Sequence, residues 1–463
     1  MKGFPMTTVV LPVVLDRADP APLPHQLARC IRDLVAHGTL RRGERLPSSR
    51  TLATDLGVSR VVTTQAYEQL VAEGWLAARP GSGTYVASDG TNLLDPPVRP
   101  ATARTGSSLT RLDTGTPWID PRWSAGWRRA WREVAAARPP RGYDDPRGLP
   151  ELREALAEHL ARSRGLVVHP DEVLTTAGAT DGWRQLLGVL DPGPVAIEDP
   201  GYRAAVVTAV AVGRSVVDLP AGTTPPRLDG IIATYVTPAH QHPTGVTMGA
   251  PERVALLAAA RGARCLVVED DYDSELRYDV APIPALAALD HNQVAYLGTA
   301  SKAVSPSLRL GWVVAPAPLT ERLVAQRAVT HDTPAWAVQR AFVSLLRDGY
   351  LDRVIRSART VYAERLARVD AALSPFAVRA GPLAGMYSTW LVPAAAATRA
   401  RDDARRAGFD VALLSDYCRS AARSGLVVGV GGCSDAQLDT ALQAMVNGLG
   451  EDNPGGHRAP SWR

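Results

Sequence analysis

The sequence of 463 residues predicts a multidomain protein in which a small α+β module precedes a large α/β domain. Apolar residues recur at helical spacing between residues 25 and 71, and two short strand-like runs follow them. Next comes a stretch rich in proline, glycine, serine and threonine. Beyond it, short apolar runs alternate with helical stretches, which is the signature of βαβ units and a mainly parallel sheet.

Composition limits the classes of function. The chain is 46% apolar and 21% charged, and it has no apolar run long enough to cross a bilayer, so we expect no membrane partner. A net charge of +4 is small, so any signal for nucleic-acid binding must be local. The four cysteines are scattered without a CxxC pair, which indicates neither a metal site nor a disulfide framework. We therefore expect a reduced, cytoplasmic protein, and we interpret residues 7–15 as an extended arm because no cleavage site follows them.

The first module begins with a helix that starts near His25 and ends at Gly38. Ser49, or alternatively Ser48, is suited to cap a second, short helix, and Gly57 makes the turn that follows it. Ser59 would cap a third helix. Its expected inner face is Val62, Ala66, Leu70 and Val71, and its expected outer residues are Arg60, Thr63, Thr64 and Tyr67. A helix, a tight turn and a second helix form the geometry that places a helix in a major groove.

Two strand-like runs, residues 75–77 and 84–86, then flank a hairpin tip of turn residues that includes Arg79, Gly81 and Gly83. Five arginines lie between residues 41 and 60, against Glu44 and Asp55. Positive charge is therefore concentrated where DNA would lie. A three-helix interaction module with a solvated basic face remains the alternative.

The runs LPSSRTLATDLGVSR and AYEQLVAEGWLAARPGSGTYV resemble the winged helix-turn-helix of GntR-type bacterial regulators. The resemblance implies a double-stranded DNA operator as partner. It implies the following DNA-binding residues: Ser48, Ser49, Arg50, Ser59, Arg60, Thr63, Thr64, Tyr67, Arg79, Gly81 and Gly83. One departure is that Val61 and Val62 precede the two threonines, where the family often has Thr-Val directly after Ser-Arg. We expect residues 1–88 to form this domain and residues 89–115 to be a flexible linker.

In residues 116–463, five apolar runs are each followed by residues suited to ligand binding, and ligands bind beyond the carboxyl ends of parallel strands. These runs and the stretches after them are residues 173–175 before TAGATD, 195–197 before EDPGY, 231–236 before TPAHQHPTG, 265–268 before EDDYD, and 294–297 before GTASK. The turn at Gly178–Thr180 opens a helix, where backbone N–H groups suit a phosphate. The residues after these five strands are therefore predicted to form one ligand-binding site.

Lys302 is the residue around which this site is organised. The chain has only two lysines, Lys2 and Lys302, and otherwise uses arginine. An amine with a tunable pKa forms a Schiff base, whereas a guanidinium stays protonated and is not nucleophilic. The alternative for Lys302 is an ordinary lysine in a surface loop. The alternative for His242 is a side chain that only packs in the core.

A lysine, a buried carboxylate, a stacking aromatic ring, a phenol and a phosphate cradle are the groups that pyridoxal 5'-phosphate requires. The segments GYDDPRGLPELREAL, EDPGY, YVTPAHQHPTG, EDDYDSELRY and PSLRLGW resemble those of fold-type-I aminotransferases, and with the GntR-like head they resemble the MocR/GabR class. The resemblance implies Lys302 as the catalytic, Schiff-base residue. It implies these cofactor-binding residues as well: Asp270 at the pyridine nitrogen, Tyr272 at the ring hydroxyl, Tyr202 stacked on the ring, Thr299, Ser301, Arg309, Gly178, Ala179 and Thr180 at the phosphate, and His242.

The resemblance also implies a head-to-tail, domain-swapped homodimer and a small-molecule effector. Aminotransferases and amino-acid-sensing members place an arginine on a late strand, but the matching residues 425–432 have none, and Arg203 lies one residue off a second clamp position. We therefore expect a transcriptional regulator that senses pyridoxal phosphate or an amino-containing ligand, as in the control of vitamin B6 synthesis, with little transaminase turnover. The alternatives are an active aminotransferase with a helix-turn-helix extension and a plain GntR-type repressor without the cofactor.

Overall fold

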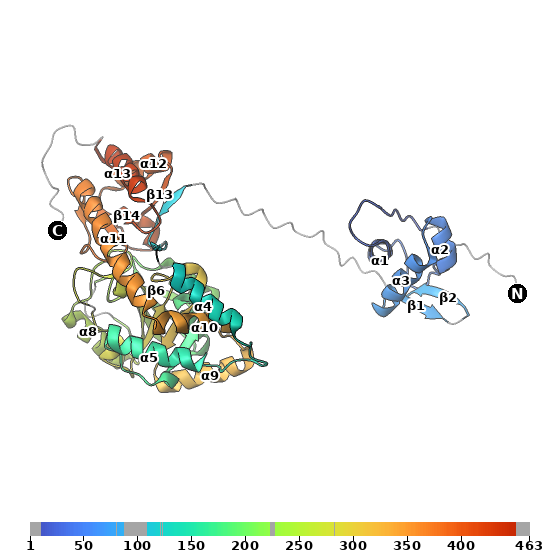
Figure 1. Cartoon of the computed structure of the whole chain (residues 1–463), viewed down its shortest axis with the longest axis horizontal. Coiled ribbons are helices and arrows are strands. Elements are labelled where there is room, and N and C mark those ends of the chain that lie inside the picture. Colours follow the sequence, from blue (N-terminus) through green and yellow to red (C-terminus); the bar gives the residue numbers. More distant parts are fainter. Residues whose placement is uncertain are drawn as a thin grey trace. The chain divides into compact units, whose positions relative to one another are not determined.

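A computed structural model of the chain describes residues 11–79, 81–87, 109–120, 122, 124–222, 227–281 and 283–450. Contacts separate the chain into two compact units, Met1–Ser107 and Ser108–Arg463 (Figure 1). Among the described residues, no helix combines the length and the apolar composition that crossing a bilayer would need.

In the small unit, the described residues form three helices and a two-stranded hairpin, as the sequence predicts. These elements are α1 (Leu23–Ala36), α2 (Ser49–Asp55), α3 (Arg60–Ala72), β1 (Leu76–Arg79) and β2 (Gly83–Val86). Leu76 lies opposite Val86 in the antiparallel pair. The core of the unit consists of apolar residues at helical spacing, and Leu27, Ile31, Ala66 and Leu70 are fully buried. Ser48 caps α2, because its side chain accepts a hydrogen bond from the Thr51 N–H.

A seven-stranded sheet forms the centre of the large unit. Its strands are β4 (Val173–Thr176), β5 (Val195–Asp199), β6 (Val216–Pro220), β7 (Ala233–Val236), β8 (Leu266–Asp271), β9 (Val294–Thr299) and β10 (Gly311–Val314). They lie in the order β4-β10-β9-β8-β7-β5-β6. Only β10 runs antiparallel to its neighbours β4 and β9. The five predicted strands are confirmed, and all five run in one direction, so their carboxyl ends lie at one edge of the sheet.

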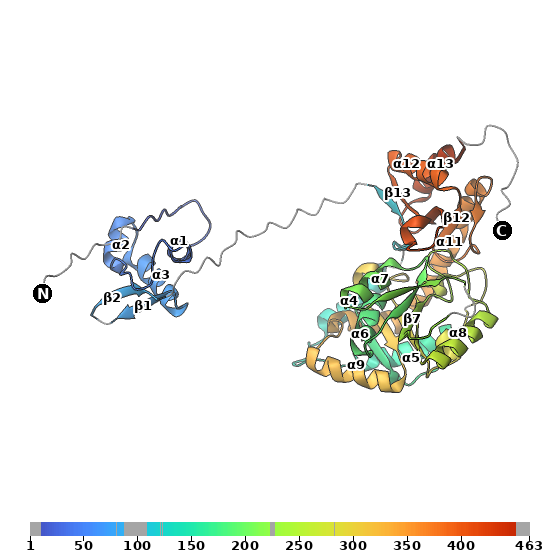
Figure 2. The same cartoon turned by 180° about the vertical axis from the view of Figure 1, so that it is seen from behind.

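Helices cover both faces of this sheet (Figure 2). They are α4 (Ser124–Ala136), α5 (Pro150–Arg164), α6 (Ala179–Val189), α7 (Arg203–Ala211), α8 (Ala250–Ala263), α9 (Ala317–Thr330) and α10 (Trp336–Arg347). Alternate strand residues enter two different cores: Val268 and Leu297 pack with α6, α7 and α9, whereas Val267 and Tyr296 pack with α5, α8 and α10. Burial on both faces explains why the strands read as nearly continuous apolar runs.

A second sheet of five strands follows, in the order β11-β12-β14-β13-β3. Its strands are β3 (Thr110–Leu112), β11 (Val378–Arg379), β12 (Tyr387–Leu391), β13 (Phe409–Leu413) and β14 (Gly425–Gly429), and its helices are α11 (Tyr350–Leu373), α12 (Ala394–Arg406) and α13 (Asp435–Gly450). The helices α12 and α13 pack against each other beside it (Figure 1).

The predicted end of the linker at residue 115 is wrong. Thr110–Leu112 form β3, which pairs in parallel with Phe409–Val411 of β13. Three residues provide too short an apolar pattern to recognise, since only Leu112 is fully buried and its strand partners are about 300 positions away in the sequence. The part of the predicted linker at residues 89–108 lies outside the described residues.

Candidate functional site

The loops that follow β4, β5, β7, β8 and β9 bring the predicted site residues to one edge of the large sheet. Lys302 lies in the turn after β9, where its Nζ donates a hydrogen bond of 2.9 Å to the Gly115 carbonyl. Burial lowers the pKa of this amine from its ordinary value, against the opposing effect of the carboxylates Asp113, Asp273 and Asp270. A lowered pKa leaves more of the amine neutral, which is the nucleophilic form.

Asp270 is a buried carboxyl group with one oxygen available. Its Oδ2 accepts a hydrogen bond of 2.5 Å from the Tyr235 hydroxyl, whereas its Oδ1 is buried and has no partner within the described part of the chain. Burial raises the pKa of Asp270 to about 7, although the Tyr235 hydrogen bond opposes this shift. A buried acceptor without a donor is costly, so a cationic N–H placed at Oδ1 would stabilise the group.

Gly178 and Arg309 form an anion cradle with the hydroxyl groups after β9. Gly178 precedes the first turn of α6 with φ of 106°, so the N–H groups of Ala179 and Thr180 start the helix. A Cβ built on Gly178 would lie 3.2 Å from Arg309 Nη2, and the positive φ is one that other residues rarely adopt, so glycine is favoured here. Thr299 Oγ1 donates to Ser301 Oγ at 2.9 Å. A helix N-terminus beside a guanidinium suits a phosphate.

Tyr202 and His242 come from the next two loops. Tyr202 precedes α7, and its ring lies edge-on to His242 with 5.4 Å between the ring centroids. The ring of His242 also contacts those of Tyr272, Tyr387 and Tyr417. Burial lowers the pKa of His242 to about 3, with Lys302 adding to the shift, so this imidazole is neutral near pH 7.

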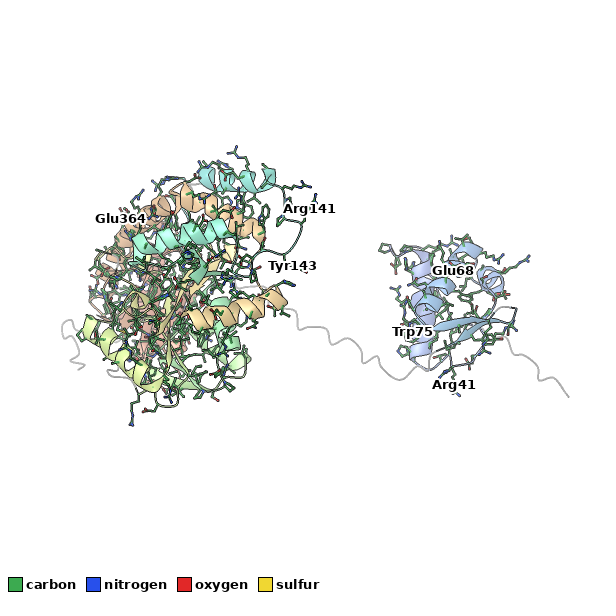
Figure 3. The ribbon with its side chains drawn as sticks, turned by 90° about the horizontal axis from the view of Figure 1, so that it is seen from below. Arg41, Glu68, Trp75, Arg141, Tyr143 and Glu364 are labelled. Carbon is green, nitrogen blue, oxygen red and sulfur yellow. The ribbon has the colours of Figure 1, made fainter. Side chains whose placement is uncertain are left out.

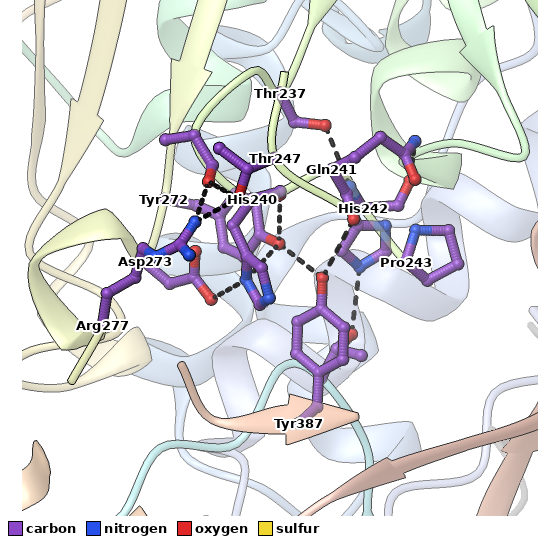
Figure 4. A network of polar contacts seen from close by, with 12 residues as sticks. Thr237, His240, Gln241, His242, Pro243, Thr247, Tyr272, Asp273, Arg277 and Tyr387 are labelled. Carbon is purple, nitrogen blue, oxygen red and sulfur yellow. Dashed lines mark hydrogen bonds and ion pairs between the residues drawn. The ribbon is translucent and has the colours of Figure 1, made fainter. Parts of the chain in front are cut away.

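Tyr272 lies at the centre of a polar network (Figure 4). Its hydroxyl donates to the His240 carbonyl at 2.9 Å and forms a second hydrogen bond, of 2.6 Å, with the Tyr387 hydroxyl. His240 Nδ1 lies 2.7 Å from Asp273 Oδ2, and both side chains are buried. The network connects the loops after β7 and β8 to β12 of the second sheet.

The sequence did not single out four residues that the structure brings to the site. Tyr235 lies in the middle of a predicted strand, where an aromatic residue reads as core. Thr114 and Gly115 fall in the predicted linker, yet Thr114 Oγ1 lies 3.1 Å from His242 Nε2. Tyr387 lies in β12, a strand the sequence reading did not include. Such long-range contacts leave no local signal in a single sequence.

The strand β14, Gly425–Gly429, contains no arginine. Arg203 is the first residue of α7 and is exposed. Tyr143 of the GYDD segment (Figure 3) is 80% exposed. Its ring stacks on that of His331, with 3.7 Å between the ring centroids.

The small unit carries the candidate nucleic-acid surface. Exposed side chains from the predicted set are Ser48, Arg50, Ser59, Arg60 and Arg79, with Gly81 exposed and Ser49, Thr64 and Gly83 partly buried. The guanidinium of Arg79 lies over the Tyr85 ring, 4.9 Å from its centroid. Val61, which is 61% exposed, and Gln65 face outward too, although the sequence reading did not include them. Farther along α3 the exposed charged side chain is Glu68 (Figure 3), so the positive charge is confined to the start of the helix.

Two residues predicted to face DNA, Thr63 and Tyr67, are buried instead. Thr63 is fully buried and its hydroxyl donates to the carbonyls of Ser49 and Arg60, at 2.7 and 3.0 Å. Tyr67 is 6% exposed, and its hydroxyl donates to the Pro47 carbonyl at 2.8 Å. The buried stripe of α3 is therefore Thr63, Ala66, Tyr67 and Leu70, whereas Val71 is exposed. Backbone carbonyls that satisfy the hydroxyl groups make this burial favourable.

Replacing Thr63 by valine is expected to destabilise the small unit by about 1–2 kcal/mol, because the hydrogen bonds that its buried hydroxyl donates to the carbonyls of Ser49 and Arg60 are lost. Thr64→Val is the matched control, since Thr64 is partly exposed and makes no such contact. Amide hydrogen exchange of residues 60–72 in the full chain measures the change. Equal protection in the two variants would contradict the buried role of Thr63.

Comparisons with known proteins place both units. Residues 23–86 match the model of the gntR family of bacterial regulatory proteins, and residues 123–444 match that of aminotransferase class I and II. The chain is 38% identical to the HTH-type pyridoxine biosynthesis transcriptional regulator PdxR of Corynebacterium glutamicum over 364 residues, 77% of this chain and 80% of that protein. It is 32% identical to the probable rhizopine catabolism regulatory protein MocR of Rhizobium meliloti, covering 76% of this chain and 77% of that one.

Among solved structures, an archaeal alanine:glyoxylate aminotransferase superposes with a TM-score of 0.67 and 25% identity, covering 75% of this chain and 92% of that one. Pyrococcus horikoshii kynurenine aminotransferase superposes with the same TM-score at 22% identity, with the same two coverages, and supports the fold alone. The predicted fold class and the resemblance to both families are therefore confirmed.

Proposed function

The chain belongs to the family of HTH-type transcriptional regulators in which a GntR-type DNA-binding domain precedes an aminotransferase-like domain, and we propose that it regulates transcription by sensing pyridoxal 5'-phosphate or an amino-containing ligand in the large domain. The observation that carries the proposal is the pairing of Lys302, whose pKa is lowered by burial, with the unpartnered Oδ1 of Asp270 at the same sheet edge.

The residues present fit this cofactor. Bound pyridoxal phosphate supplies an aldehyde that a lysine amine can hold and a pyridine ring that withdraws electrons. Asp270 Oδ1 would accept a hydrogen bond from the ring nitrogen, and the carboxylate would keep that nitrogen protonated. Arg309, with the helix start at Gly178–Thr180 and the hydroxyls of Thr299 and Ser301, would hold the phosphate. Tyr202 would stack on the ring, Tyr272 would donate to the ring hydroxyl, and His242 would also contact the cofactor.

The lack of a carboxylate-binding arginine on β14 argues for sensing rather than turnover. A bidentate guanidinium holds an α-carboxylate in a fixed orientation, and without it an amino acid would be poorly positioned for proton transfer. Regulation of pyridoxine biosynthesis, which the name of the relative from Corynebacterium glutamicum states for that protein, would fit such a site here.

DNA binding completes the proposal. We propose that two chains form a head-to-tail homodimer in the cytoplasm, so that two copies of α3 read two half-sites of one operator. Ligand binding in the large domains would change the spacing of the two heads.

The test is the absorption spectrum of the purified protein, followed after adding members of an amino-acid panel. We expect a visible cofactor band that any responsive amino compound shifts once, without repeated turnover. Rapid multiple turnover would support an active aminotransferase instead. A colourless protein that stays colourless after pyridoxal phosphate is added would leave only the DNA-binding half of the proposal.

A further inference from the structure

Tyr235 is a buried tyrosine that holds the carboxyl group assigned above to the pyridine nitrogen. It lies in β7, is 1% exposed, and donates from its hydroxyl to Asp270 Oδ2 at 2.5 Å. Tyr235 is paired in register with Val268 of β8, and Asp270 follows two residues later on the same face of that strand. The phenol therefore reaches along the sheet toward the strand ends where the cofactor would lie.

The Tyr235 hydroxyl can only donate in this bond near neutral pH. Burial, with Asp270 adding to the effect, raises its pKa well above the ordinary value, so the hydroxyl stays protonated. Asp270 Oδ2 is therefore the acceptor. Oδ1 is the oxygen left for a ligand, since it is buried and has no partner in the described part of the chain. The bond thus decides which oxygen of the carboxylate meets the cofactor.

Trp183 supports the ring of Tyr235. The centroids of the two rings lie 5.3 Å apart, and Trp183 is fully buried in α6. Its indole Nε1 donates to the Ala205 carbonyl of α7 at 3.0 Å. The helix α6 begins at the predicted phosphate cradle, and α7 begins just after Tyr202. The residues that hold Tyr235 in place are therefore part of the same helices that position two other predicted contacts of the cofactor.

Tyr235 is also the main support for the charge of Asp270. Burial favours the neutral carboxyl group, and the nearby Asp271 and Asp273 add to that effect. Tyr235 and, to a smaller extent, Lys302 favour the carboxylate. Loss of the Tyr235 hydroxyl would therefore raise the pKa of Asp270 further and shift this group toward its neutral form, which holds a protonated pyridine less well.

We propose that Tyr235 is a positioning residue for the cofactor, which turns Asp270 Oδ1 to the pyridine nitrogen and so keeps that nitrogen protonated. This inference rests on the proposed function, and it gives a role toward pyridoxal phosphate to a residue outside the predicted cofactor-binding set. A protonated pyridine withdraws electrons from the carbon that the lysine holds, which makes the lysine nitrogen less basic. Tyr235 therefore sets the pH at which the colour of the bound cofactor changes.

Binding of two compounds to the full-length protein tests the proposal, after its own cofactor has been removed. The first compound is pyridoxal 5'-phosphate, and the second is its deaza analogue, in which a C–H group replaces the ring nitrogen. We expect Tyr235→Phe to weaken binding of pyridoxal phosphate about tenfold, because a hydrogen bond to a buried charge is lost. Binding of the analogue should stay within about twofold, because the analogue has no donor for Oδ1. Equal losses for the two compounds would reveal a purely structural role of the phenol and would overturn the proposal.

The pH dependence of the visible band is a second readout. Its midpoint should rise by about one pH unit in Tyr235→Phe, because a ring nitrogen that is less often protonated withdraws fewer electrons. Difluorotyrosine in place of Tyr235 keeps the ring and makes the hydroxyl a stronger donor, so the midpoint should fall instead. This opposite shift keeps the test decisive if Tyr235→Phe does not fold. A midpoint that difluorotyrosine leaves unchanged would overturn the proposal.

Tyr296→Phe is the matched control. Tyr296 lies in β9, is 2% exposed, and donates from its hydroxyl to Asp271 Oδ2 at 2.7 Å, so it forms the same kind of buried bond on the opposite face of the sheet. It should leave the binding of both compounds and the midpoint near those of the unaltered protein, and effects equal to those of Tyr235→Phe would contradict the proposal. An unaltered protein that binds neither compound would refute the proposed function itself. If the unaltered protein binds pyridoxal phosphate and Tyr235→Phe binds it equally well, only the role of Tyr235 is overturned.

Discussion

Replacing Lys302 by alanine is expected to abolish covalent retention of pyridoxal phosphate. The unaltered protein, treated with borohydride and dialysed, should retain the cofactor in proportion to chain, whereas the variant should retain none. The physical reason is that no other side chain at this sheet edge offers a neutral amine, since every other cation there is a guanidinium. Absorbance of the denatured protein and peptide mapping measure the label.

Lys2 provides an internal control that few proteins offer, because it is the only other lysine of the chain. Lys2→Ala should retain the full label, and Lys302→Arg should behave like the alanine variant even though it keeps the positive charge. Label on residue 2, or retention by Lys302→Arg, would contradict the assignment of Lys302.

Replacing Arg60 by alanine is expected to weaken operator binding roughly tenfold near physiological salt and to reduce the slope of log K against log salt concentration by about 0.9. Arg60 is the exposed first residue of α3, beside the start of the recognition surface. A lost phosphate contact releases one fewer counterion, so affinity and slope fall together. Fluorescence anisotropy with a duplex selected by the unaltered protein measures both at several salt concentrations.

Arg50→Ala should give the same pattern, because Arg50 is an exposed residue of α2. Arg29→Ala on α1 is the control, since that arginine pairs with Asp19 and lies outside the helix-turn-helix. A slope that both Arg60→Ala and Arg50→Ala leave unchanged would show that other residues hold the phosphates.

The sequence was sufficient for much of the fold because its signals were local. Each of the five predicted strands is a short apolar run buried on both faces, and Gly38 ends a helix with φ of 72°. The three-residue strand β3 was missed because a strand of that length gains its meaning only from its distant partner β13. The five predicted strands do not include the antiparallel strand β10, Gly311–Val314, although it is as short and as buried as they are.

Two residues of α3 that the sequence predicts to face DNA are buried because their hydroxyl groups find partners inside the small unit. Thr63 and Tyr67 were assigned to DNA because they carry hydroxyl groups, but the spacing of residues 63, 66, 67 and 70 places them on one buried stripe. The Thr63 hydroxyl donates to the carbonyl of Ser49, the first residue of α2, and the Tyr67 hydroxyl donates to the carbonyl of Pro47, just before α2. In the candidate cofactor site, Lys302 and Asp270 can be predicted from the sequence around them. Tyr235 cannot, because its contact with Asp270 depends on how β7 pairs with β8.

Gly115 lies where the chain enters the large domain, just after β3. The segment that arrives from the DNA-binding domain joins the second sheet as β3 and, three residues later, offers its carbonyl to the Lys302 amine. A lysine nitrogen bound to a cofactor carbon would carry fewer hydrogens than the free ammonium group, so its hydrogen bond to the Gly115 carbonyl would be weakened or lost. Occupancy of the lysine would therefore change a contact of the segment that follows β3.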